Sequence, residues 1–276
     1  TNVELHERLS ARALALGDTE RYLGAVRAQL AATSETASRH ALVLDAVGAL
    51  RSQLEAAPAA WELLEPVFRQ APSTEMAAVF LDLAAEVGQI EAAVDAVRAL
   101  AESASGTSRM QLLQAVAGVA RTQLPSHPTT YAIDQSILLA APEDVAAFDH
   151  ASAYARAEGA WSDWVELVEA HAAAAASERA AALLADAADV CQRRLNDPAR
   201  AYGLVQWAWA LTPSDAELAE RVFTAHLAHD ALPKAATMVL EGALGPDPGA
   251  RRVADLLQGL REEHEDALAE RLGGWL

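Results

Sequence analysis

Three residues in the C-terminal part of the chain have the types and spacing of a metal site. His226, His229 and Asp230, in the stretch AHLAHD, follow one another at intervals of three residues and one residue. On a helix they share a face, where two imidazoles and a carboxylate could hold zinc. The alternative is that these residues form an ordinary polar helix end, because histidines are favourable near the C-terminal end of a helix, where the helix dipole is negative. We favour the helix end and expect neither a metal nor any other cofactor.

Cys191 is the only cysteine and the second candidate for chemistry. Its surroundings, DAADVCQRRL, suit a small packing residue better than a reactive thiolate. A single cysteine excludes an intrachain disulfide and is in keeping with a reducing, cytoplasmic location. We therefore expect Cys191 to be buried and inert.

The sequence lacks the local motifs that would indicate an enzyme. It has no Walker phosphate loop, GxGxxG, GxSxG, HExxH or paired-cysteine zinc pattern. The stretch GPDPG at 245–249 is interpreted as a turn before the last helix rather than a phosphate cradle. We expect a protein that is not an enzyme, with an all-α enzyme of dispersed catalytic residues as the less favoured alternative.

Composition indicates an all-helical protein. Of 276 residues, 52% are hydrophobic but only 5% aromatic. Much of the apolar content is alanine, the strongest helix former, and no alternating strand pattern occurs. One lysine against twenty arginines, together with the alanine, is typical of a GC-rich bacterial genome. The absence of a long apolar run predicts no membrane span.

The chain is strongly acidic, with a net charge of −18. Residues 1–140 contain 10 basic and 16 acidic residues and residues 141–276 contain 11 and 23, so the two parts carry −6 and −12. Such a field repels phosphate backbones and argues against nucleic-acid binding. It permits a basic protein partner, although acidity also serves solubility.

Proline, glycine and arginine recur at a fixed stride, which indicates an internal repeat. The ladders are Arg39, Arg109 and Arg179 at 70 and 70; Pro58, Pro128 and Pro198 at 70 and 70; Pro72, Pro142 and Pro213 at 70 and 71; and Gly17, Gly88, Gly159 and Asp230 at 71 each. They define periods 39–108, 109–178 and 179–249. We expect one helical-repeat domain over 1–276, cut from a longer chain.

Within each period the recurring prolines and glycines mark the boundaries of four helices, that is, of two helical hairpins. Asn196 and Asp197 end one helix and cap the next, with Pro198 in its first turn. Ser214 and Glu217 form a capping box, and Gly159 ends a helix in the left-handed conformation. The expected hairpins are 2–16/19–32, 39–55/59–70, 74–87/89–102, 109–124/129–140, 144–158/160–174, 178–195/199–211 and 215–229/232–243, followed by a helix at 250–272.

Two segments are open to a different interpretation. Residues 171–190 contain neither glycine nor proline, so a continuous helix is the alternative to the break that periodicity requires. Pro66 lies inside the expected helix 59–70 and should kink or shorten it.

The hairpins resemble tetratricopeptide repeats in divergent form. The best match is AAEVGQIEAAVDAVRAL, whose turn glycine is Gly88 and whose second-helix packing positions are Ile90, Ala93, Val97 and Leu100. Further matches are Ala201, Ala208, Asp230, Leu232 and Ala235. Trp164 and Tyr22 depart from the family's small-residue position, and the first-helix Trp-Leu-Gly-Tyr signature is absent.

The resemblance implies an all-α, right-handed solenoid of about seven stacked hairpins plus a terminal helix, with a concave groove that binds peptides or proteins. Its register places six residues on the groove, mostly acidic: Glu75, Asp82, Asp149, Arg156, Glu220 and Thr224. The alternative for these residues is an ordinary solvated face. The family's clamp for C-terminal peptides is not identifiable.

Six tryptophans stand out in an alanine-rich chain. Trp161 and Trp164 share a helix face, whereas Trp207 and Trp209 point in different directions, so one of the latter pair should be less buried. Filling of gaps between hairpins is the favoured interpretation, and a binding patch is the alternative.

The sequence thus predicts a noncatalytic scaffold that binds a protein or peptide, with a basic partner preferred, through its groove or exposed ends. A regulatory or substrate-recruiting module of a larger multidomain enzyme is the alternative. Because the last helix ends in LGGWL, with Trp275 and Leu276, we also expect further repeats or a partner to cover one end, or the ends to self-associate.

Overall fold

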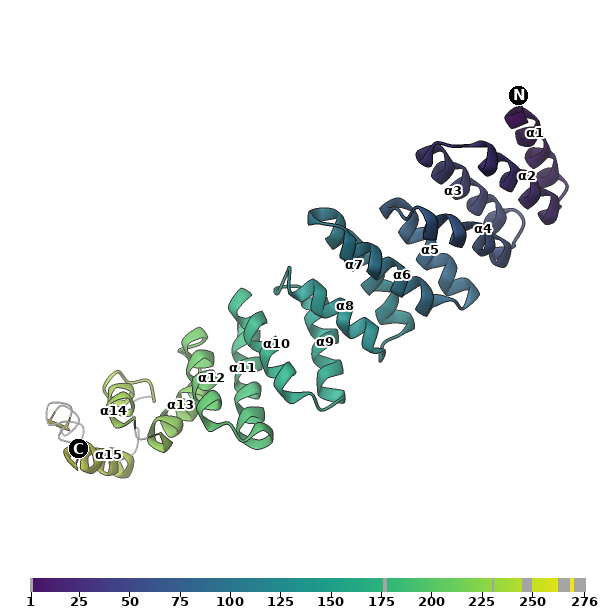
Figure 1. Cartoon of the computed structure of the whole chain (residues 1–276). Helices are drawn as coiled ribbons and strands as arrows, with labels where there is room; N and C mark the ends of the chain where they lie inside the picture. The colour runs from purple at the N-terminus through teal and green to yellow at the C-terminus, as the bar shows by residue number, and fades with distance from the viewer. Residues whose placement is uncertain (1, 176–177, 230, 245–249, 263–268, 271–276) are drawn as a thin grey trace. The chain divides into compact units, whose positions relative to one another are not determined.

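The computed structural model describes the whole chain except residues 1, 176–177, 230, 245–249, 263–268 and 271–276. In the described residues all regular structure is helical, which confirms the all-α prediction (Figure 1). The chain divides into two compact units, Thr1–Ala141 and Pro142–Leu276. No helix in the part that the structure describes is long and apolar enough to cross a membrane.

Unit 1 contains eight helices that pack successively along the chain. They are α1 (Asn2–Ala15), α2 (Thr19–Ala32), α3 (Thr36–Ser52), α4 (Ala57–Gln70), α5 (Thr74–Val87), α6 (Ile90–Ser103), α7 (Gly106–Gln123) and α8 (Pro128–Leu138).

Unit 2 continues the same pattern of neighbouring helices packed in pairs. Its elements are α9 (Val145–Ala157), α10 (Trp161–Ala174), α11 (Glu178–Val190), a π-helical turn η1 (Cys191–Leu195), α12 (Pro198–Leu211), α13 (Ala216–Ala228), α14 (Leu232–Leu240) and α15 (Ala250–Glu262).

The 70-residue stride corresponds to four helices, as predicted. Successive periods begin with α3 at Thr36, α7 at Gly106 and α11 at Glu178. The first two starts lie three residues earlier than the sequence predicts. Whether the whole of 1–276 forms one domain, and whether it belongs to a longer chain, stay predictions.

The repeated residues occupy equivalent places in successive hairpins. Pro58, Pro128 and Pro198 lie in the first turns of α4, α8 and α12, where a missing N–H breaks no helical hydrogen bond. Gly17, Gly88 and Gly159 follow the first helices of their hairpins with φ of 68°, 72° and 70°. Left-handed backbone of this kind favours glycine, so the ladders mark helix ends.

The boundary between η1 and α12 explains why proline follows Asn-Asp. Asn196 adopts φ 52° and ends the helical segment, and the Asp197 carboxylate accepts a hydrogen bond from the Arg200 N–H at 3.0 Å. Both roles were predicted. The predicted capping box at Ser214 is wrong, because the first-turn N–H groups of α13 donate instead to the carboxylate of Asp215.

Pro66 does not shorten its helix. Of the two predicted effects, a kink or a shortened helix, the shortening does not occur, because α4 continues through Pro66 to Gln70. The ring is exposed, while Val67 and Phe68 beside it are buried, so packing of the apolar face holds the helix together across the missing hydrogen bond. Over 171–190 the predicted break is confirmed, because α10 ends at Ala174 and α11 begins at Glu178.

The cores contain many alanines and a few large side chains that fill the remaining space. In unit 1, Phe80 stacks between Phe68 and Trp61, at centroid distances of 4.2 and 4.8 Å. In unit 2, Trp164 is fully buried, and its indole N–H donates to Ser152 at 2.7 Å. The buried face of α9 carries small residues, among them that serine and Ala155.

Trp161, Trp207 and Trp209 of unit 2 are half-buried, so both members of the Trp207 and Trp209 pair fall in the same range of exposure.

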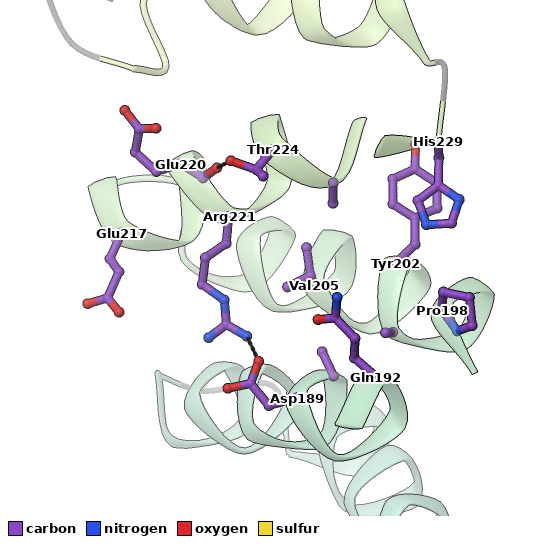
Figure 2. A pocket seen from close by; sticks show the side chains of 13 residues that line it. Asp189, Gln192, Pro198, Tyr202, Val205, Glu217, Glu220, Arg221, Thr224 and His229 are labelled. Atoms are coloured by element: carbon purple, nitrogen blue, oxygen red, sulfur yellow. Dashed lines mark hydrogen bonds and ion pairs between the residues drawn. The ribbon is translucent and has the colours of Figure 1, made fainter. Parts of the chain in front are cut away.

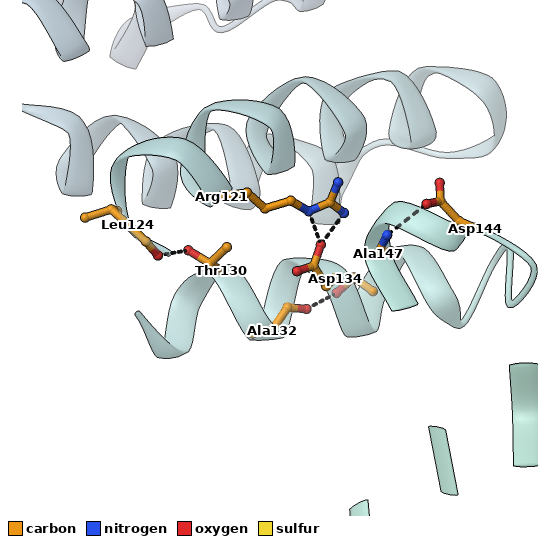
Figure 3. Close-up of polar contacts among 8 residues, drawn as sticks. Arg121, Leu124, Thr130, Ala132, Asp134, Asp144 and Ala147 are labelled. Atoms are coloured by element: carbon orange, nitrogen blue, oxygen red, sulfur yellow. Dashed lines mark hydrogen bonds and ion pairs between the residues drawn. The ribbon is translucent and has the colours of Figure 1, made fainter. Parts of the chain in front are cut away.

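Unit 1 also contains a buried ion pair between neighbouring helices (Figure 3). Asp134 of α8 has a fully buried side chain, and Arg121 of α7 donates to it through two nitrogens, with Nε 2.9 Å from the carboxylate oxygen. Thr130, also buried, donates to the Leu124 carbonyl at 2.8 Å. Together these bonds tie α8 to the end of α7.

Candidate functional site

A groove opens between α11, α12 and α13 of unit 2 (Figure 2). Its volume is about 370 Å³. Much of its lining is apolar and comes from small or compact side chains: Ala188, Pro198, Ala201, Val205 and Ala225. Side chains of this kind leave room for a ligand, whereas larger ones would close the space.

A second compartment of about 490 Å³ lies between α11 and the start of α13. It shares Glu217 and Arg221 with the first, so the two adjoin along α13. We name the two compartments together the α11–α13 groove.

The α11–α13 groove is strongly acidic. Six carboxylates line it, against one arginine and one histidine. The carboxylates are those of Glu178, Asp186, Asp189, Asp215, Glu217 and Glu220. With the histidine neutral, the lining therefore carries a net charge of −5.

Helical spacing places most polar side chains of α13 on one face. Glu217, Glu220, Arg221 and Thr224 are separated by three, one and three residues, which aligns them along the helix. The opposite face carries Val222 and Phe223, which are buried. The amphipathic pattern of α13 therefore directs its charges into the groove.

Arg221 crosses the groove to α11. Its Nη2 lies 2.8 Å from Asp189 Oδ1 and 3.0 Å from the Ala185 carbonyl oxygen (Figure 2). The charges of Arg221 and Asp189 offset each other within the groove.

Tyr202 of α12 forms one end of the groove. Its hydroxyl is 2.8 Å from Nδ1 of His226, and its ring stacks on His229 with a centroid distance of 4.5 Å. Burial lowers the pKa of His226, and the positive charge of Lys234 lowers this pKa further. The neutral imidazole can accept a hydrogen bond from the Tyr202 hydroxyl, and this bond holds Tyr202 at the end of the groove.

Of the residues that suggested chemistry, the two histidines and the cysteine pack against their neighbours. His226 is buried against Tyr202 and His229 is exposed beside it; Asp230 lies outside the described residues. No group of three metal-ligating side chains occurs in the part of the chain that the structure describes. Cys191 is fully buried, and burial raises the pKa of its thiol, so it packs as predicted.

Two of the six residues predicted for the groove, Glu220 and Thr224, line the α11–α13 groove. Asp149 and Arg156 lie on α9, where Asp149 pairs with Arg179 and Arg156 lies over the Trp164 ring at 5.1 Å. Glu75 and Asp82 are exposed on α5, in the other unit. A binding role for any of the six stays a prediction.

Sequence reasoning missed the pair of Asp189 and Arg221, although a signal for it exists. Opposite charges about one hairpin apart recur in the chain and form contacts between equivalent helices. Asp189 and Arg221 are 32 residues apart, and Glu169 and Arg200, joined by two hydrogen bonds of 2.8 and 3.0 Å, are 31 apart. A search for charge pairs at this interval would have found them.

The fold and the groove define a class: an all-α helical-repeat protein with an acidic groove. The chain matches no protein-family model, and no curated protein sequence matches it.

Similar solved structures include three that are described as tetratricopeptide-repeat proteins or domains. A tetratricopeptide-repeat protein from Parabacteroides merdae is 15% identical with a TM-score of 0.37, over 94% of this chain and 98% of that one. The TPR2AB domain of yeast Sti1, in complex with pHSP90, is 12% identical with a TM-score of 0.35, over 98% of each chain. The P58(IPK) TPR domain is 14% identical with a TM-score of 0.28, over 98% of this chain and 79% of that one.

Proposed function

We propose that the protein is a noncatalytic scaffold that binds a basic segment of a protein partner in the α11–α13 groove. The observation that carries this proposal is the lining, with its net charge of −5 beside an apolar floor. Lysine and arginine side chains combine an apolar stem with a cationic head, so both parts of the lining have a counterpart in a basic peptide. Helices fixed by packing present this surface with little loss of entropy on binding.

The proposal is tested with two labelled peptides of about twelve residues, one alternating arginine and alanine and one alternating glutamate and alanine. Fluorescence anisotropy with the full chain should show binding of the arginine peptide alone. Its affinity should fall as salt is added, because the contacts are between partly exposed charges.

Variants locate the binding surface. Glu217→Gln combined with Asp186→Asn removes two carboxylates of the groove and should weaken binding about tenfold. Glu158→Gln is the matched control, because Glu158 is an exposed carboxylate of the same unit that does not line the groove. Equal binding of both peptides, or an unchanged affinity in the double variant, would show that the groove is not the site.

A further inference from the structure

The hairpin of α1 and α2 in unit 1 exposes a row of large apolar side chains. Leu5 and Leu9 of α1 and Leu16, the residue directly after the helix, have exposures of 56%, 47% and 66%. The Leu16 N–H still donates to the Arg12 carbonyl oxygen, so spacings of four and seven residues keep the three side chains on one side. They are half of the six large hydrophobic residues that the described part of the chain exposes. Grouping of this kind marks an interaction surface, whereas single exposed leucines are ordinary.

A groove of about 550 Å³ runs beside this row, between α1 and α2. Leu9 and Leu16 line one side, and Gly24, Ala25 and Ala28 of α2 line the other. A Cβ atom added to Gly24 would meet no atom within 4 Å, so the space above this glycine is open. A floor of small side chains next to large ones is the shape into which the ridge of another helix packs.

The charge of this groove is opposite to that of the chain as a whole. Its lining includes Arg12, Arg21 and His6 and contains no carboxylate, in a chain with 39 acidic residues against 21 lysines and arginines. Arg21 is paired with Asp18 at 3.3 Å. Arg12 forms no ion pair with any described residue, so its charge is available to a ligand.

We propose that the α1–α2 groove binds an amphipathic helix whose apolar stripe is flanked by acidic residues. The stripe packs against the exposed leucines and the small floor, and the flanking carboxylates lie beside Arg12 and His6. This partner is opposite in charge to the basic segment proposed for the α11–α13 groove. The two grooves share no lining residue, so either proposal can fail while the other holds.

The test uses two peptides of about sixteen residues with leucines at the same helical spacing, flanked by glutamate in one and by lysine in the other. Fluorescence anisotropy uses the full chain carrying Glu217→Gln and Asp186→Asn, which weakens the α11–α13 groove as a competing site for the lysine peptide, and should show that the glutamate peptide binds about tenfold more tightly than the lysine peptide. Arg12→Glu should remove this preference, because it reverses the charge at the rim.

A second variant fills the groove without removing any contact. Gly24→Leu places a side chain in the open space, and leucine is a better helix former than glycine, so the variant should fold. It should weaken binding of the glutamate peptide at least about tenfold. Gly48→Leu on α3 is the matched control, because a Cβ at Gly48 also meets no atom within 4 Å.

The proposal is overturned if both peptides bind equally well or if Gly24→Leu binds like the unchanged chain. Sedimentation velocity over a range of concentrations tests another occupant. Three results together would show that a second copy covers this face: the chain self-associates, Gly24→Leu abolishes the association, and neither peptide binds. The proposed acidic helix would then be wrong.

Discussion

At the scale of single residues, the buried His226 makes the stability of the folded chain depend on pH. Its pKa lies below its ordinary value of 6.5 because the side chain is buried, with a smaller contribution from Lys234. The folded chain therefore keeps the imidazole neutral where the unfolded chain would protonate it. Stability from this group is complete above pH 6.5 and is lost as pH falls from there towards the lowered folded pKa.

We accordingly expect the urea midpoint of the wild-type protein to fall between about pH 7.5 and pH 5.5. His226→Leu should flatten this dependence, because it removes the titrating group. Tyr202→Phe is the control that keeps the imidazole buried and should retain the slope. A slope of equal size in His226→Leu would assign the pH effect to other groups.

The Arg121 and Asp134 pair allows a second prediction at the residue scale. The Asp134 side chain is fully buried. Removing its cationic partner leaves a carboxylate where water cannot reach it. Arg121→Met should therefore destabilise the protein by about 3 kcal/mol, measured by urea denaturation.

The double variant Arg121→Met/Asp134→Asn is the control for this prediction. A neutral amide needs no cation, so part of the lost stability should return. If the double variant is as unstable as Arg121→Met, lost packing of the arginine stem is the cause and the charge argument fails.

Residue-level prediction worked where a role is local and failed where it depends on tertiary partners. Asn196 and Asp197 could be assigned because capping is decided within a few residues. The pairing of Asp189 with Arg221 could not be read from either local sequence, because it joins two helices across the groove. For the same reason only Glu220 and Thr224 were placed at the groove found here.

At the scale of the element, helix α4 shows packing overriding local preference. Pro66 removes one helical hydrogen bond, yet the helix continues because its other face is buried. Pro66→Ala should restore that bond and stabilise the protein by about 1–3 kcal/mol. Pro58→Ala is the matched control, because Pro58 lies in the first turn of α4 and breaks no such bond. A loss of stability in Pro66→Ala would mean that the ring itself contributes to the native structure.

The start of α13 supplies a prediction about caps. Asp215 accepts hydrogen bonds from the N–H groups of Glu217 and Leu218, at 2.9 and 3.1 Å. Asp215→Ala should lower stability by about 1 kcal/mol, whereas Ser214→Ala should have little effect. Equal losses in the two variants would favour the capping box that the sequence suggested.

The number and order of the helices could be predicted from the sequence because the same prolines and glycines at helix boundaries recur three times. One proline or glycine is ambiguous, but Pro58, Pro128 and Pro198 at equal intervals identify equivalent helix starts. Periodicity even located the break between Ala174 and Glu178, where no breaker residue occurs. The start of α3 was predicted three residues too late, and α3 has no side-chain cap at its first turn that would mark it.

At the scale of the whole molecule, contacts are mostly between successive helices, as expected for a repeat array. In such an array a segment of several hairpins has its own core and does not need the rest of the chain to fold. We expect residues 1–141 and 142–276, produced separately, each to give a helical circular dichroism spectrum and a cooperative unfolding transition. If either segment is unfolded alone, the chain folds as one indivisible domain.

Separate segments would also divide the two proposed binding activities. Residues 142–276 contain the whole acidic α11–α13 groove, and residues 1–141 contain the whole α1–α2 groove. Folded 142–276 should bind the arginine peptide with the affinity of the full chain, and folded 1–141 should bind the glutamate-flanked helix. Because each groove is built from helices of one unit only, a loss of affinity on separation of two folded segments would mean that neither groove, as described, is a complete site.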